Sequence, residues 1–96
     1  MILVLDLGNT NLCIGVYKNE ALICSCRTDS DLNRSSDMYA SLISNFLIRH
    51  HLDTSNFDGA ILSSVIPSLT DVITLAVENV INKKCLVISQ GIKTGL

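Results

Sequence analysis

The sequence has few charged residues and no long hydrophobic run. Charged residues make up 17% of its 96 residues, the net charge is −2, and no basic cluster occurs. Binding to nucleic acid by neutralisation of its phosphates is therefore not expected. The longest uncharged stretch, residues 59–70, is too short to span a membrane. Asp6 ends the N-terminal apolar run after five residues, and no basic residue precedes it, so we expect no signal peptide.

Common metal-binding and nucleotide-binding motifs are missing as well. The four cysteines, at positions 13, 24, 26 and 85, form no C-x-x-C pair, and the two histidines are adjacent, so the pattern of a zinc site is absent. We expect reduced thiols and a cytoplasmic location. Neither G-x-x-x-x-G-K-[ST] nor G-x-G-x-x-G occurs, which argues against a P-loop and against a Rossmann site.

The sequence does contain a polar segment, residues 6–11 (Asp-Leu-Gly-Asn-Thr-Asn), directly after the apolar run. This pattern predicts a β-hairpin whose tip exposes backbone N–H groups beside the carboxylate of Asp6. Polyphosphates bind to such N–H groups, and Mg²⁺ binds to carboxylate oxygens. Gly8 has no Cβ atom and would let a phosphate approach the backbone, while Asn9 and Thr10 would add side-chain donors. The alternative is an ordinary hairpin turn, because Gly-Asn is common in turns.

Apolar periodicity predicts five strands and two helices in the order βββαβαβ. The strands are expected at residues 2–5, 12–17, 21–28, 60–65 and 85–89, and the helices from Ser35 or Ser36 to near His51 and from Pro67 to about Ile81. Ser68 and Asp71 have the spacing of a capping box at the start of the second helix. Tyr39 is expected to pack with its hydroxyl at the surface. Because the later strands follow helical crossovers, they should lie parallel in a mixed five-stranded sheet, which makes the chain an α/β domain.

Two serines are further candidates for a ligand cleft. Ser63 and Ser64 end a strand that is expected to be parallel, and ligands of α/β sheets bind at that edge. The alternative is that these hydroxyls cap the following helix or satisfy a polar turn.

Five short motifs in series resemble the N-terminal domain of type III pantothenate kinases, a family that includes proteins of the Bvg accessory factor type. The motifs are residues 6–17 (D-x-G-N-T-x-x-x-x-G-V-Y), Arg27-Thr28, Asn33-Arg34-Ser35 with Asp37-Met38-Tyr39, residues 63–67 (Ser-Ser-Val-Ile-Pro) and residues 91–96 (Gly-Ile-Lys-Thr-Gly-Leu). Two positions depart from the family pattern: Met38 stands in place of an acid, and Ser35 in place of a threonine. The resemblance implies a ribonuclease H-like (actin-like ATPase) fold. It also implies that residues 1–96 are the N-terminal lobe of a two-lobed kinase, with the second lobe absent from this sequence.

The same resemblance implies an activity and a set of site residues. The full-length protein would use ATP to phosphorylate pantothenate to 4′-phosphopantothenate, the first step of coenzyme A biosynthesis. The residues implied to bind the ATP phosphates are Asp6, Leu7, Gly8, Asn9, Thr10, Asn11, Leu12 and Cys13, with Asp6 also organising Mg²⁺. Lys93 and Thr94 would support the cleft or form a solvated turn, and the catalytic aspartate would lie beyond Leu96.

The resemblance further implies a monovalent cation (K⁺ or NH₄⁺) and a homodimer. From the charge and the hydrophobic pattern we expect no nucleic-acid partner and no membrane partner. Two alternatives remain open. In the first alternative, the chain is a non-catalytic nucleotide-binding or regulatory module, as an accessory factor would be. In the second, it is part of another kinase or ATPase of the same superfamily.

Overall fold

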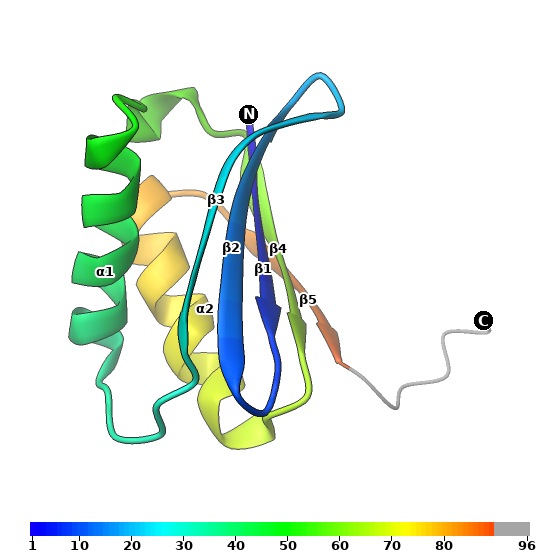
Figure 1. The fold of residues 1–96 in the computed structure, drawn as a ribbon, viewed down its shortest axis with the longest axis vertical. Coiled ribbons are helices and arrows are strands. Elements are labelled where there is room, and N and C mark those ends of the chain that lie inside the picture. The colour runs from blue at the N-terminus through cyan, green and yellow to red at the C-terminus, as the bar shows by residue number, and fades with distance from the viewer. Residues whose placement is uncertain (90–96) are drawn as a thin grey trace, which may run out of the picture.

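Short apolar segments form five strands of one mixed sheet in the computed structural model, which describes residues 1–89 (Figure 1). The strands are β1 (Ile2–Leu7), β2 (Asn11–Lys18), β3 (Ala21–Asp29), β4 (Gly59–Ser64) and β5 (Cys85–Ser89), and their order in the sheet is β3-β2-β1-β4-β5. Adjacent strands in the hairpins β1–β2 and β2–β3 are antiparallel, whereas β4 is parallel to both β1 and β5. The predicted element order and the parallel later strands are thus confirmed.

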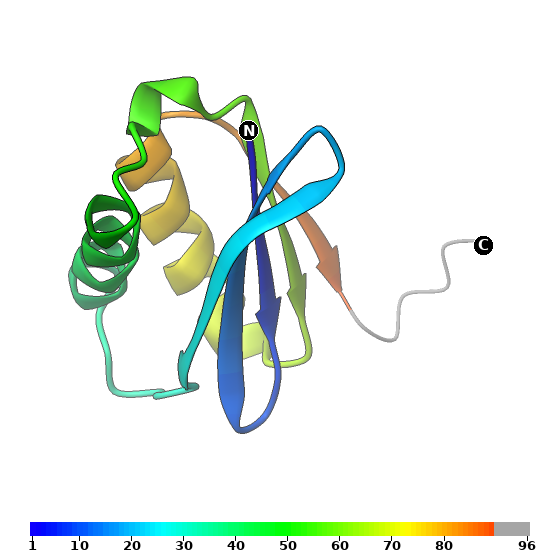
Figure 2. The ribbon, with the colours of Figure 1, turned by 45° about the horizontal axis from the view of Figure 1, so that its top comes forward.

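Two helices, α1 (Ser36–Arg49) and α2 (Pro67–Ile81), lie on the same side of the sheet (Figures 1 and 2). A short 3₁₀ helix, η1 (Thr54–Asn56), leads from α1 towards β4. Both crossovers run in the same direction across the sheet, so the right-handed rule for such connections puts both helices on one face. No helix among residues 1–89 is long and apolar enough to cross a membrane.

The helix starts show one correct and one wrong prediction. Ser35 caps α1 as expected, because its side chain accepts a hydrogen bond from the Met38 amide. The capping box at Ser68 and Asp71 is wrong. Pro67 occupies the first turn of α2 and Ile66 is the capping residue, with no side-chain hydrogen bond, so Ser68 already lies inside the helix.

The core lies between the two helices and one face of the sheet. Leu3, Leu5 and Leu7 alternate along β1 and are fully buried, as are the inward-facing residues of β2. Tyr39 of α1 is also fully buried, so the prediction of a surface hydroxyl is wrong. Its hydroxyl is instead satisfied by the backbone of Asp31.

The opposite face of the sheet, which we call the open face, is not covered by any element among residues 1–89 (Figure 2). Asp6 and Cys13 lie on it and are exposed. Exposed apolar side chains of β2, β3 and β5 also lie on it: Tyr17, Leu22, Leu86 and Ile88. The sheet therefore has one face that builds the core and one face that carries the acid of the polar segment.

Candidate functional site

Three connections meet at the carboxyl end of β1 (Figure 1). They are the β1–β2 bend (residues 8–10), the β3–α1 loop (residues 30–35) and the link from β4 to α2. Ligands of open α/β sheets bind outside the carboxyl ends of the strands, so this edge is the expected position of a site. It is also the edge to which the polar segment belongs.

The β1–β2 bend is closed by few contacts of its own. Leu7 pairs with Leu12, and the Gly8 N–H donates to the Asn11 carbonyl over 2.8 Å. Asn9 and Thr10 at the tip are exposed, and their amides make no hydrogen bond within residues 1–89. Two adjacent backbone donors are therefore available to a ligand, as an anion site requires.

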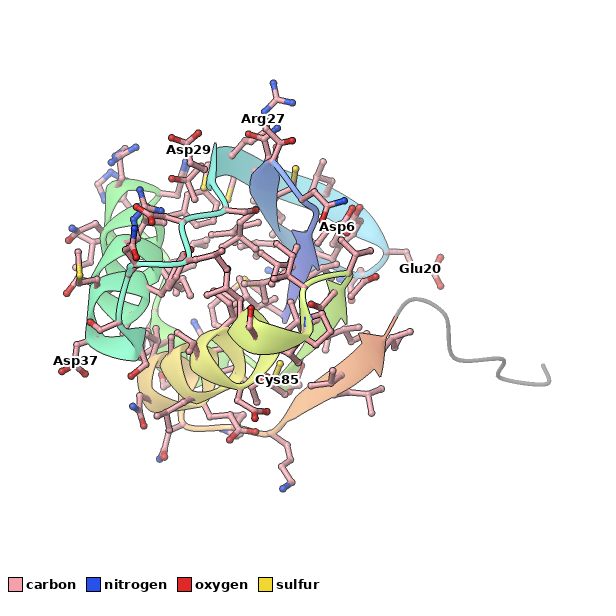
Figure 3. All side chains as sticks on the ribbon, turned by 90° about the horizontal axis from the view of Figure 1, so that it is seen from below. Asp6, Glu20, Arg27, Asp29, Asp37 and Cys85 are labelled. Atoms are coloured by element: carbon pink, nitrogen blue, oxygen red, sulfur yellow. The ribbon has the colours of Figure 1, made fainter. Side chains whose placement is uncertain are left out.

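The carboxylate of Asp6 lies beside the bend on the open face. Asp6 pairs with Cys13 of β2 and with Ser63 of β4, and residues paired across strands share a face of the sheet. Cys13 pairs in turn with Arg27 of β3, so an exposed guanidinium stands two strands from the acid. Figure 3, which looks onto this end of the molecule, shows Asp6 and Arg27 away from Asp37 on α1.

A shallow hollow of ≈ 200 Å³ lies on the open face next to Asp6. Its lining includes Asp6, Cys13, Tyr17 and Ser25, and it exists because Gly15 contributes no side chain there. A second hollow, of ≈ 250 Å³, is lined by residues around the end of α2, from Glu78 to Lys84, and includes no residue of the bend. Only the first hollow adjoins the predicted phosphate site.

The two serines at the end of β4 have different surroundings. Ser63 lies on the open face beside Asp6. Ser64 is buried, and its hydroxyl accepts from the Ile66 amide over 3.1 Å and from the Thr70 hydroxyl over 2.8 Å. The Ser64 side chain thus stabilises the start of α2 and does not face a cleft, whereas the Ser63 side chain remains available to one. Lys93 and Thr94 lie outside the described residues.

Within residues 6–13, the side chains divide by face. Leu7 and Leu12 are fully buried in the core, so they can offer a ligand only their backbone. Gly8 is half-buried, and a Cβ atom added there would stand 3.4 Å from the Asn11 carbonyl oxygen, which is ordinary contact. The fold itself therefore has room for an alanine at position 8.

One contributor to the site was not anticipated from the sequence. Ser30, in the β3–α1 loop, donates from its hydroxyl to the Gly8 carbonyl over 2.7 Å and from its amide to the Thr10 carbonyl over 2.9 Å. A polar run such as residues 29–36 predicts only a loop. The available signal was that β3 pairs with β2, which brings the residue after β3 next to the bend.

Most of the thiols are unsuited to chemistry at neutral pH. Burial raises the pKa of Cys24 and Cys26, and burial with a smaller contribution from Glu78 raises the pKa of Cys85 to about 11. Because the thiolate is the nucleophile, these three side chains are poor nucleophiles. They are free thiols that pack against or within the core.

Residues 2–96 match the type III pantothenate kinase family. The chain belongs to this family. Two relatives named type III pantothenate kinase align with all 96 residues: the protein of Moorella thermoacetica at 34% identity and that of Listeria innocua at 38% identity. The chain spans 38% of the first protein and 37% of the second, so it corresponds to little more than a third of a type III pantothenate kinase.

Solved structures confirm the expected fold. A structure described as a putative N-acetylglucosamine kinase from Porphyromonas gingivalis superposes with a TM-score of 0.67 at 15% identity, over 93% of this chain and 34% of that one. A ROK hexokinase from Thermus thermophilus superposes with a TM-score of 0.62 at 16% identity, over 92% of this chain and 34% of that one. This domain thus has the actin-like ATPase fold of these sugar kinases.

The acid beside the bend suits one kind of metal ion. Residues 1–89 contain no group of three or more His, Cys, Asp or Glu side chains that would enclose a metal ion. Mg²⁺ keeps several waters and is commonly held by one or two carboxylates together with substrate phosphates. The exposed Asp6 next to two unpaired amides fits Mg²⁺ that arrives with a polyphosphate, and does not fit an ion held by protein ligands alone.

Proposed function

We propose that the full-length protein transfers the γ-phosphoryl group of ATP to the primary hydroxyl of pantothenate and forms 4′-phosphopantothenate, the first step of coenzyme A biosynthesis. Membership of the type III pantothenate kinase family supports this pair of substrates. One observation carries the nucleotide assignment. The unpaired amides of Asn9 and Thr10 lie beside the Asp6 carboxylate, at the edge of the sheet where such folds bind ligands.

In this proposal residues 1–96 are the N-terminal lobe and hold the phosphates of ATP. The amides of Asn9 and Thr10 bind phosphate oxygens, and Asp6 takes up Mg²⁺ directly or through water. When bound, Mg²⁺ offsets the charge on the β- and γ-phosphates. The pantothenate hydroxyl oxygen forms a bond to the γ-phosphorus, and the bond from that phosphorus to ADP breaks. The hydroxyl proton passes to an aspartate that we place beyond Leu96.

The proposal includes four properties of the complete protein. It works as a homodimer in the cytoplasm, it requires K⁺ or NH₄⁺, and it uses a small molecule as its acceptor. Lys93 and Thr94 are proposed to support the acceptor side of the cleft. The family match supports the small-molecule acceptor, and the resemblance implies the homodimer and the monovalent cation for a complete member. The cytoplasmic location rests on the expectation of reduced thiols.

Release of ADP by the full-length protein tests the proposal. With ATP, Mg²⁺ and K⁺ present, ADP release should depend on pantothenate and should not be sustained by glucose or N-acetylglucosamine. Replacing K⁺ with Na⁺ should lower the rate. ADP release that is driven by a sugar would favour another kinase of the superfamily, and ATP binding without transfer to any acceptor would favour a regulatory module.

A further inference from the structure

Ser30 contacts both sides of the β1–β2 bend. Its hydroxyl donates to the Gly8 carbonyl over 2.7 Å, and its amide donates to the Thr10 carbonyl over 2.9 Å. The two carbonyls flank Asn9, the first residue at the tip. A single residue of the β3–α1 loop therefore holds the backbone on either side of the tip.

These contacts fix the direction of the amides. In a planar trans peptide the C=O and the following N–H point in opposite directions. Because the Gly8 carbonyl is directed at the Ser30 hydroxyl, the Asn9 N–H is directed away from the β3–α1 loop. The Thr10 carbonyl is held in the same way, which fixes the peptide plane that follows Thr10.

The residues on either side of Ser30 are themselves anchored. The buried Tyr39 hydroxyl accepts from the Asp31 amide and donates to the Asp31 carbonyl, both over 2.9 Å. Arg34 donates to the Asp29 carbonyl over 3.0 Å, and its guanidinium lies 5.4 Å from the centre of the Tyr39 ring. Tyr39 of α1 and Arg34 of the loop thus hold the two residues that flank Ser30.

We infer that Ser30 is a positioning residue for the nucleotide phosphates, which holds the β1–β2 bend in the shape that presents the Asn9 amide to them. This inference rests on the proposed function, because it takes the bend to be the phosphate site. The Ser30 hydroxyl does not contact the phosphates in this account. It acts through the Gly8 carbonyl.

Steady-state kinetics of the full-length protein test the inference with three variants. Ser30→Ala should raise the KM for ATP about 10-fold, the upper range for the loss of one neutral hydrogen bond, with little change in the KM for pantothenate. Ser30→Thr keeps a hydroxyl and should restore most of the ATP affinity. Ser55→Ala is the matched control, because the Ser55 hydroxyl also donates a hydrogen bond, to Asp53 over 2.9 Å, but lies in η1.

The outcomes separate the inference from the proposed function. An unchanged KM for ATP in Ser30→Ala would overturn the inference and leave the kinase proposal standing. A loss of ATP affinity that Ser30→Thr does not restore, or that Ser55→Ala reproduces, would also overturn it. Thermal melting of each variant shows whether it is folded. Failure of the unmodified full-length protein to bind ATP at all would instead refute the proposed function.

Discussion

The two hairpin connections of β2 are closed in different ways. The β2–β3 turn has Asn19 and Glu20 at its centre, both in the left-handed region with φ of 52° and 70°. Two such residues are typical of the type I′ turn, whose twist matches that of the flanking strands. At the β1–β2 bend neither Asn9 nor Thr10 has a positive φ, and Ser30 supplies two of the hydrogen bonds that hold it.

This difference indicates what each connection is adapted to do. The β2–β3 turn needs no partner outside its own hairpin and lies exposed at the far end of the sheet from Asp6. The β1–β2 bend depends instead on hydrogen bonds from Ser30, outside its own hairpin. Two of its amides are unpaired within residues 1–89, beside a carboxylate and at the edge of the sheet where ligands bind.

The largest expected effect comes from removing the acid beside the bend. Asp6→Asn in the full-length protein should lower kcat on the order of 100-fold, because a phosphate-bound Mg²⁺ loses its charged ligand. The fold should be unchanged, since Asp6 is exposed. Glu20→Gln changes the acid at the other connection in the same way and should leave kcat unaltered. Near-normal turnover in Asp6→Asn would refute the metal role.

A smaller effect is expected from a methyl group at the bend. Gly8→Ala should weaken ATP binding about 10-fold, or about 1.4 kcal/mol, if phosphate lies against the backbone there. Gly59→Ala is a close control, because its added Cβ would also stand 3.4 Å from a backbone oxygen, that of Lys84. Calorimetric titration with ATP and Mg²⁺ should separate the two variants. Equal affinity in both would argue against phosphate at Gly8.

Alkylation of the four cysteines compares the open face of the sheet with the core. Cys13 is exposed beside Asp6 and should react with iodoacetamide first at neutral pH, and ATP with Mg²⁺ should slow that reaction several-fold. Cys24 and Cys26 should react only as the pH rises further, because burial raises their pKa and lowers their thiolate fraction. Cys85, with a pKa of about 11, should react last.

Mass spectrometry of the alkylated peptides measures this order directly. Protection of Cys24 and Cys26 by ATP, with none at Cys13, would place the nucleotide on the core face of the sheet. That result would contradict a phosphate site on the open face beside Asp6.

The smallest effect is expected at the β2–β3 turn. Glu20→Gly should raise the free energy of unfolding by up to about 1 kcal/mol, because glycine adopts a positive φ without the cost that a glutamate carries. The kinetic constants should not change. A change in the KM for ATP would show that this turn also takes part in nucleotide binding, which would break the contrast between the two connections.

Most of the fold could be predicted because it depends on local patterns. The continuous apolar run of residues 2–5 predicted a strand, although only one of its faces is covered within residues 1–89, and Pro67 marks the start of a helix. The strand predicted at residues 2–5 in fact reaches Leu7, because Asp6 and Leu7 continue the ladder with β2. Apolarity alone does not reveal such a polar extension.

The parts that could not be predicted depend on contacts between distant residues. The polar composition of the loop after β3 gives no reason to single out Ser30, whose partner Gly8 lies 22 residues earlier. The start of α2 is different, because Ser64 and Thr70 hold it through local contacts, as the alternative for Ser64 anticipated. The Gly-Asn pair predicted the bend itself, but the hydrogen bonds from Ser30 that hold the bend became apparent only in the structure.

The central claim is that the amides of the β1–β2 bend bind the phosphates of a nucleotide. Titration of the ¹⁵N-labelled full-length protein with ATP and Mg²⁺, followed by amide NMR, tests it most directly. We predict large shifts for the amides of Asn9 and Thr10 and none for those of Asn19 and Glu20. Saturation with ATP that leaves the Asn9 and Thr10 signals in place would contradict the account.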